Sequence, residues 1–248
     1  MRDHLVITLA APLVSHGDLA GHERRGGAAW PGRSAVLGLV GAALGLRRSD
    51  AKAQRALNEG YGVAVLVHRP GEILRDYHTA QTVPSAKVKR PATRADALQR
   101  GRAAGALNTV ISIREYRMDA LFKACLYARG APRWSLEDLR QALLRPRFAV
   151  YLGRKSCPLA APMNPRIVRA NDAHDALLPA DPEAEERPGI ASDTDPETLI
   201  AAPDGLAEVP AAARRERRWD VPGDRRGWHF APREAIVIPL RTAQADGA

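Results

Sequence analysis

The sequence predicts an α+β fold on three observations. Apolar segments of strand length occur near both ends of the chain and in its middle, at 4–13, 61–69 and 235–240. Segments with helical spacing of apolar residues lie between them, at 34–46 and from residue 135 onward. The order of these elements suits helices packed against a sheet. With 248 residues, the chain can bury a sizeable core, and we expect a single domain over 1–248.

The N-terminal segments predict a strand, a loop and a glycine-rich helix. Residues 4–13 form the opening strand, and 15–31 read as a polar loop. The helix at 34–46 carries three glycines on one side, each costing about 1 kcal/mol relative to alanine, which suggests close packing against a sheet. Arg33 and Ser34 stand at its N-terminus, where free N–H groups and the helix dipole favour an anion.

A strongly basic segment follows the next two predicted strands. A helix at 50–59 precedes strands at 61–69 and 73–83, and residues 84–105 then hold six Lys or Arg against one Asp. This segment has few large apolar residues, so we expect a basic loop or flexible hairpin tip; a disordered linker is the alternative.

The second half of the chain predicts a hairpin, a helix and two further strands. Strands at 109–117 and 120–129 are expected to join in a tight turn at Met118 and Asp119. Ser135 is the expected N-cap of a helix that ends near Leu144. Strands follow at 148–152 and 235–240. Together the elements predict a ferredoxin-like (RRM-like) βαββαβ core with a loop-rich C-terminal part.

Charge is distributed unevenly along the chain. The net charge is +9, but residues 172–212 carry eleven acids and one arginine, which leaves +19 for the rest of the chain. We expect 172–212 to be an acidic loop insertion and the basic remainder to attract a polyanion, above all nucleic acid. A solubilising surface is the alternative. Aromatic content is only 5%, so contacts to the nucleic-acid backbone should dominate.

The sequence lacks the motifs of several classes of metal-binding, nucleotide-binding and hydrolytic proteins. The two cysteines lie far apart, which suits a reducing compartment, and no metal-ligand spacing of Cys or His is present. The sequence contains no Walker, GxGxxG, HExxH or GxSxG motif. Without a signal peptide or an apolar segment of membrane-spanning length, a cytoplasmic protein is expected, with no metal, no cofactor and no membrane partner.

The segment 147–162 predicts an anion-binding turn. The predicted strand 148–152 ends at Gly153, which turns the chain into Arg154, Lys155 and Ser156. Two cations and a hydroxyl on a glycine turn suit a phosphate, with Pro158 and Pro162 stiffening the exit. An ordinary surface turn is the alternative.

His78 is the candidate catalytic residue in an alternative interpretation of the sequence. On a strand, Asp76 and His78 share one side while Tyr77 and Gln81 share the other. Near Lys87 and Lys89, the imidazole is a candidate base for metal-independent RNA cleavage. The simpler interpretation is that His78 and Gln81 bind RNA or the protein's own loops through hydrogen bonds.

Four segments in order resemble the CasD family, at 31–46, 76–83, 151–162 and 217–233. CasD is the subunit of the type I-E CRISPR Cascade complex that holds the 5′ end of the guide RNA. The resemblance implies a repeat-associated (RAMP) fold with a projecting β-hairpin thumb, here at 84–105. It also implies a non-catalytic subunit that binds the 5′ handle of the guide RNA and caps the backbone filament. The partners are then the backbone subunit (CasC) and the large PAM-reading subunit (CasA), with target DNA met indirectly through the complex. A type I-C relative cleaves precursor RNA, which keeps the endoribonuclease alternative open.

The resemblance implies RNA-binding residues in four segments. These are the entry to the first helix, the strand leading into the thumb, the thumb itself, and the glycine turn. The expected RNA-binding residues are Arg33, Ser34, Tyr77, His78, Gln81, Lys87, Lys89, Arg90, Tyr151, Gly153, Arg154, Lys155 and Ser156. Trp219 and the neighbouring cations Arg214, Arg215, Arg217 and Arg218 are expected to contact RNA or a partner subunit.

Overall fold

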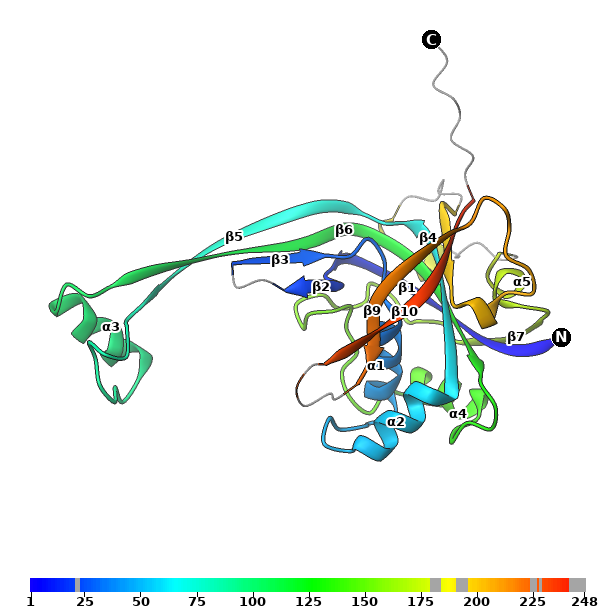
Figure 1. Ribbon diagram of the computed structural model, residues 1–248, viewed down its shortest axis with the longest axis horizontal. Coiled ribbons are helices and arrows are strands. Elements are labelled where there is room, and N and C mark those ends of the chain that lie inside the picture. The colour runs from blue at the N-terminus through cyan, green and yellow to red at the C-terminus, as the bar shows by residue number, and fades with distance from the viewer. Residues whose placement is uncertain (21–22, 179–183, 191–195, 224–226, 228, 241–248) are drawn as a thin grey trace, which may run out of the picture. The chain divides into compact units, whose positions relative to one another are not determined.

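Figure 1 shows a computed structural model of the chain, which describes residues 1–20, 23–178, 184–190, 196–223, 227 and 229–240. The chain separates into two compact units. The body unit comprises Met1–His16, Ala28–Glu72 and Arg117–Ala248. The hairpin unit comprises Gly17–Gly27 and Ile73–Tyr116.

The body unit contains an α+β arrangement built on an antiparallel sheet. In its described part the strand order is β7-β1-β6-β4-β8-β10-β9, and every neighbouring pair is antiparallel. The strands are β1 (Arg2–Val14), β4 (Tyr61–Arg69), β6 (Asn108–Ala128), β7 (Arg166–Ala170), β8 (Thr198–Ala201), β9 (Arg214–Pro222) and β10 (Phe230–Pro239). The body unit includes β6 only from Arg117 onward.

Helices and short turns cover both faces of this sheet. Residues of α1 (Arg33–Ala43), α2 (Ala51–Gly60) and α4 (Leu136–Leu144) join the core on one face, which also takes Phe122 from β6. Residues of α5 (Ala173–Leu177) join the core on the other face, which takes Cys125 and Tyr127 from the same strand. The short turns are η1 (Ala184–Glu186) and η2 (Pro203–Gly205). Alternate residues of one strand therefore enter two different cores.

The predicted starts of α2 and α4 are confirmed, and in both helices a side chain caps the first turn. Asp50 accepts a hydrogen bond from the backbone N–H of Ala53 at the start of α2. Ser135 and Asp138 form a reciprocal capping box at the start of α4. The predicted strand 61–69 is confirmed as β4, and the glycine-rich helix is confirmed as α1.

The hairpin unit consists of four strands and a helix in its described residues. β5 (Glu72–Thr82) pairs with the first half of β6, and β3 (Arg24–Gly27) pairs with β6 and with β2 (Gly17–Ala20). Figure 1 shows β5 and β6 as the long strands of this unit. Glu115 joins three segments, because its carboxylate accepts hydrogen bonds from Arg24 (3.0 Å), Arg75 (3.4 Å) and the backbone of Gly27 (3.1 Å).

The basic segment 84–105 is not only a loop, because it contains α3 (Arg94–Ala103). Thr93 caps this helix, and Val88, Ala97 and Gly101 are buried. Gly101 lies so close to Val83 that a Cβ added there would be 2.4 Å from the valine side chain. Small residues thus let this helix pack closely without large apolar side chains.

Two predicted elements in the second half are wrong. Instead of a hairpin at Met118 and Asp119, β6 runs through both residues, because Ala11 and Leu13 of β1 keep their register with Ala120 and Met118. Residues 148–152 do not form a strand. The N–H groups of Arg147 and Phe148 instead bond the carbonyls of Ala43 and Ala42 at the end of α1.

Three further segments differ from the expected loops. The acidic segment 172–212 contains β8, which pairs with both β4 and β10 inside the sheet, because its residues Leu199, Ile200 and Ala201 are apolar enough to be buried. The predicted acidic loop also includes 179–183 and 191–195, which lie outside the described residues. Residues 15–31 contain β2 and β3, and the basic segment near Trp219 is the strand β9. Within the described residues, no helix has both the length and the apolar character needed to cross a bilayer.

Candidate nucleic-acid interface

The turn at 153–156 is held tightly against the end of β1. Gly153 has φ +94°, and a Cβ there would lie 1.8 Å from the carbonyl oxygen of Ser15, so a larger residue does not fit. The backbone N–H of Ser15 donates to the carbonyl of Leu152 at 3.0 Å, which fastens the two segments together.

Buried residues on either side fix the shape of the turn. Leu152 and Cys157 are buried, and the N–H of Leu152 donates to the carbonyl of Cys157 at 2.9 Å. The N–H of Cys157 in turn donates to the carbonyl of Arg154 at 2.9 Å. Lys155 and Ser156 are exposed, while Tyr151 and Arg154 are half-buried. The sequence therefore predicted this turn correctly, although the strand expected before it does not form.

A neutral histidine lies below the turn. The His16 ring is buried and packs edge-on against Phe122, with 5.6 Å between the ring centroids. Burial, together with the nearby charge of Arg117, lowers the pKa of His16 to about 4. The imidazole is therefore uncharged at neutral pH. His16 therefore adds no positive charge beside the turn.

Arg33 is not available to an external anion, which contradicts the prediction. Its side chain is only 3% exposed, and its guanidinium donates hydrogen bonds to Asn58 and to the carbonyl of Tyr61, the latter at 2.9 Å. Burial lowers the pKa of Arg33 to about 10, so the group stays charged at neutral pH. Arg33 is thus an internal donor that joins α1 to the end of α2.

The protein supplies its own anion to the N-terminus of α1. A carboxylate oxygen of Asp220 accepts a hydrogen bond from the backbone N–H of Arg33 at 2.7 Å. The same carboxylate pairs with Arg233 at 2.6 and 3.0 Å. The helix terminus was correctly predicted to favour a negative charge, but that charge is Asp220 rather than a phosphate. Ser34, which is half-buried, stays a candidate.

The hairpin unit presents its predicted residues to solvent. Tyr77 is 61% exposed, and His78 and Gln81 are also exposed. The Nδ1 atom of His78 lies 2.8 Å from a carboxylate oxygen of Asp76, as their alternation on one strand predicted. Lys87, Lys89 and Arg90 are exposed beyond β5.

Sequence reasoning missed a second property of the hairpin unit, which is its exposed apolar surface. Large apolar side chains on both strands are exposed, namely Ile73, Leu74, Tyr77, Val110 and Ile111. In the sequence they resemble core residues of a sheet. The available signal was the basic, apolar-poor segment between the two strands, which offers no large layer to cover them.

The basic cluster on β9 is mostly paired internally. Arg214 and Arg215 pair with Glu216 and Glu234. Arg218 lies over the Trp30 ring at 4.9 Å, and Arg217 lies over the exposed Trp219 ring at 5.6 Å. The predicted contact with RNA or a partner thus rests on Arg217 and Trp219.

One grouping of acids and histidine occurs in the described residues, at Asp172, His174 and Asp175. Its buried member already has a structural role, because the two carboxylate oxygens of Asp172 accept backbone hydrogen bonds from Asp175 (2.9 Å) and Ala207 (2.8 Å). This arrangement fastens α5 and needs no ion to explain it.

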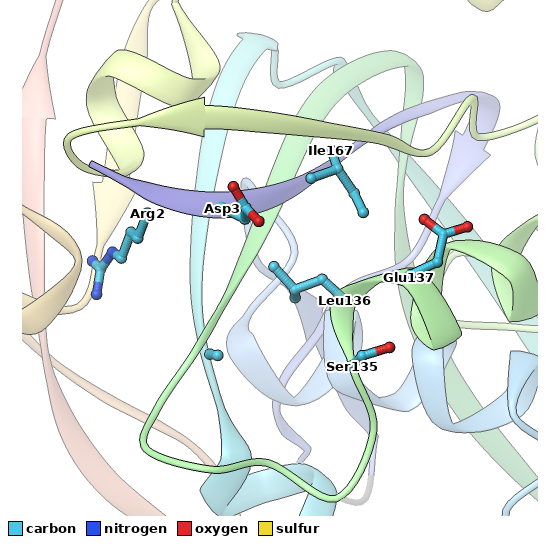
Figure 2. Close-up of a pocket in the computed structure, with 7 residues that line it drawn as sticks. Arg2, Asp3, Ser135, Leu136, Glu137 and Ile167 are labelled. Atoms are coloured by element: carbon cyan, nitrogen blue, oxygen red, sulfur yellow. The ribbon is translucent and has the colours of Figure 1, made fainter.

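A hollow of about 370 Å³ lies beside α4 (Figure 2). Leu136 of α4 and Ile167 of β7 point toward one another there, while Arg2 points away. Its lining residues are Arg2, Asp3, Ala128, Ser135, Leu136, Glu137 and Ile167. None of the predicted RNA-binding residues is among these lining residues. The lining combines acidic and basic side chains, which does not favour a polyanion.

Two solved structures share the fold. A chain described as "CRISPR RNA-guided surveillance complex" matches with a TM-score of 0.63 and 24% identity, over 95% of this chain and 89% of that chain. A second, described as "Crystal structure of Cas protein", matches with a TM-score of 0.55 and 24% identity, over 96% of this chain and 94% of that chain.

Sequence comparisons place the chain in a family. The family model described as "CRISPR-associated protein (Cas_Cas5)" matches residues 4–236. The "CRISPR system Cascade subunit CasD" of Escherichia coli (strain K12) is 33% identical over 190 residues, which cover 73% of this chain and 79% of that protein. The predicted resemblance is confirmed, and the chain belongs to the CasD/Cas5 family of CRISPR-associated proteins.

Proposed function

We propose that this chain is a cytoplasmic subunit of an RNA-guided CRISPR complex, in which it holds the 5′ handle of the guide RNA. Family membership and the similarity to a Cascade subunit support the assignment to such a complex. The main observation in favour of RNA binding is the turn at 153–156. Backbone hydrogen bonds hold this turn in place, and it presents Lys155 and Ser156 to solvent. A pre-ordered cationic turn loses little conformational entropy when it binds a phosphate.

Within this turn the residues have different tasks. Arg154 offers a planar fork of donors for a phosphate or a base edge, and Lys155 supplies a less directional charge. Ser156 adds a hydroxyl, and Gly153 permits the close approach to Ser15. The half-buried ring of Tyr151 is suited to stacking on an unpaired base. RNA contacts by Ser34 belong to the same proposal.

We assign the body unit to the ferredoxin-like class. Four neighbouring strands at one side of its sheet have the order β7-β1-β6-β4. Helix α1 connects β1 to β4, and α4 connects β6 to β7, which is the arrangement of a βαββαβ unit. We assign the hairpin unit to the family's thumb, with Lys87, Lys89 and Arg90 near its tip and with Tyr77, His78 and Gln81 on β5 as further RNA contacts.

The exposed apolar residues of the hairpin unit suit a protein partner. Ile73, Leu74 and Val110 are exposed on a narrow unit that has cations beside them, a combination typical of interfaces. We assign this surface to the neighbouring backbone subunit (CasC), and the exposed Trp219 with Arg217 to a second partner, the large subunit (CasA). Target DNA would be met only through the assembled complex.

One contact favours a second candidate function, endoribonuclease activity. The carboxylate of Asp76 lies 2.8 Å from His78 Nδ1, which orients the imidazole as in many general bases. Incubating the full chain with a repeat-containing transcript, without divalent metal, tests this alternative. Cleavage that is abolished in His78→Ala would establish it. An intact transcript leaves the non-catalytic function, which we favour.

The turn is tested by replacing its two cations. We expect Arg154→Gln with Lys155→Gln to weaken binding of a 5′-handle RNA several-fold to a hundredfold. The slope of log affinity against log salt should become shallower by about 1.4, which corresponds to about 0.7 for each phosphate that is no longer neutralised. Fluorescence anisotropy across a salt series measures both quantities.

A matched control distinguishes the turn from general charge. Arg133 and Arg169 are exposed in the body unit, so Arg133→Gln with Arg169→Gln removes the same charge elsewhere. An equal decrease of affinity in the two double variants would show that RNA binding depends only on net charge, and the proposed site would be abandoned.

A further inference from the structure

A second cationic surface lies where α1 and α4 end. It consists of Arg47, Arg145, Arg147 and Phe148, which we call the helix-end patch. The backbone places these residues together, because the N–H groups of Arg147 and Phe148 donate to the carbonyls of Ala43 and Ala42 at the end of α1, at 3.0 and 3.1 Å. Arg145 is the C-cap residue of α4.

Close packing fixes the patch on the end of α1. Gly45 has φ +77°, and a Cβ there would lie 2.8 Å from the Cδ atom of Arg147, so the arginine stem lies directly over this glycine. Arg47 follows two residues later and lines a hollow of about 460 Å³. The lining residues of this hollow are Gly45, Leu46, Arg47, Ser49 and Asp50.

The cations of the patch differ from those arginines of the protein that form ion pairs. Arg24, Arg129, Arg166 and Arg233 each pair with a carboxylate. Within the described residues, no ion pair involves Arg47, Arg145 or Arg147. Asp50 is the acid beside Arg47, and its carboxylate caps α2 through the N–H of Ala53. The patch therefore keeps an excess of positive charge.

Phe148 has no evident structural reason to be exposed. Its side chain is 44% exposed, and Leu144 in the last turn of α4 is 49% exposed. The partial negative charge at the ends of α1 and α4 explains why cations are stable here, but it does not explain an exposed aromatic ring. Cations beside an exposed ring are the elements with which proteins bind single strands, through phosphate contacts and base stacking.

We propose that the helix-end patch binds a single-stranded polynucleotide, with a base stacked on Phe148 and phosphates on Arg47 and Arg145. Four residues separate Phe148 from Gly153, so a strand held at the turn has a short path to the patch. Stacking and phosphate contacts are shared by RNA and DNA, so the strand is either the guide RNA or another single strand that reaches the complex. The proposal does not require that the handle binds at 153–156.

Two variants give different signatures in a binding experiment with the full chain. The probes are fluorescein-labelled 12-mers of riboadenylate and of deoxyadenylate, measured by anisotropy across a salt series. Arg47→Gln with Arg145→Gln should reduce the salt slope by about 1.4, since two phosphates are no longer neutralised. Phe148→Leu should weaken binding about 5- to 100-fold at each salt concentration and leave the slope unchanged, because it removes stacking but no charge.

Controls keep the test specific. Phe148→Tyr retains an aromatic ring and should restore affinity, and Arg133→Gln with Arg169→Gln should change affinity less than the patch variant does. Each variant is also made in the Arg154→Gln, Lys155→Gln background, where the patch effects should persist if the two sites are separate. A stronger effect on one probe identifies the source of the strand.

The result that overturns the proposal is equally direct. If Phe148→Leu binds both probes as tightly as the wild type, or if the slope does not change in Arg47→Gln with Arg145→Gln, the patch does not bind a single strand. A patch that serves a protein partner gives that outcome. Weaker handle binding in the turn variant alone, with no effect of the patch variants, would support the proposed function and reject only this inference.

Discussion

β4 and β5 follow each other in the chain, yet their side chains have opposite environments. In β4 the residues from Tyr61 to His68 are buried, whereas in β5 nearly every residue is exposed, including Ile73 and Leu74. Both are paired strands, so pairing alone does not bury a side chain. In the body unit, helices on one face and α5 on the other complete the core.

This difference separates apolar residues that stabilise the fold from those available to a partner. Burial of a leucine side chain contributes roughly 1.5–3 kcal/mol to folding, and an exposed one leaves that free energy for an interface. The same contrast holds for charge. Arg33 is buried and its guanidinium bonds groups inside the protein, whereas Lys155 is exposed on a fixed turn.

The largest expected effect tests the buried half of this comparison. Leu66 of β4 is fully buried, so Leu66→Ala should lower the free energy of unfolding by about 2–5 kcal/mol through reduced burial and a cavity. Leu74→Ala in β5 should lower it by less than about 1 kcal/mol. Urea denaturation of both variants measures the difference, and equal decreases would mean that β5 is covered within the protein.

A smaller effect compares two carboxylates whose arginine partners differ in exposure, since Arg233 is largely buried whereas Arg24 and Arg75 are exposed. Asp220 is buried and holds Arg233 and the N-terminus of α1, so Asp220→Ala should cost about 3 kcal/mol, since the buried Arg33 N–H and Arg233 lose their partner. Glu115 of the hairpin unit joins two exposed arginines, and Glu115→Ala should cost about 1 kcal/mol or less. Thermal and chemical denaturation report the body unit, and limited proteolysis near β5 reports the hairpin unit. Equal costs would remove the distinction.

The smallest effect depends on pH and concerns His16. The folded pKa of His16 is lowered to about 4 from the ordinary value of 6.5, so the unfolded chain binds more protons between these pH values. Stability should therefore be complete above pH 6.5 and fall as the pH drops toward 4, by on the order of 2 kcal/mol at pH 4.5. The lowered pKa of His4 acts in the same direction.

His16→Leu isolates this contribution. Neither ring nitrogen of His16 has a hydrogen-bond partner among the described residues, so leucine removes the titration without removing a bond. The variant should lose less stability than the wild type between pH 6.5 and 4.5 in urea titrations. An unchanged pH dependence would show that the imidazole is not buried in solution.

Much of the fold follows from local patterns in the sequence. Apolar runs identified β1 and β4, the capping Ser135 identified α4, and the glycine in 153–156 identified a real turn. These signals are local, because a cap or a left-handed turn depends on residues within a few positions of each other. The family resemblance was also visible in the sequence, in four ordered segments.

Other features depended on contacts between distant segments. The sequence could not show that Met118 and Asp119 continue a strand, because their register is set by β1 more than a hundred residues earlier. Nor could it show that the acidic segment contributes β8 to the middle of the sheet.

The sequence by itself determined that the chain is basic, that it combines helices with strands, and that a glycine turn presents Arg154, Lys155 and Ser156. Only the tertiary structure decided which cations stay exposed to solvent. Arg33 and Lys155 both lie within two residues of a glycine, but Asn58 and the carbonyl of Tyr61 enclose the Arg33 guanidinium, whereas Lys155 is exposed. The physical reason is that a charge binds the partner that folding brings nearest, and that partner is fixed by long-range packing rather than by neighbouring residues.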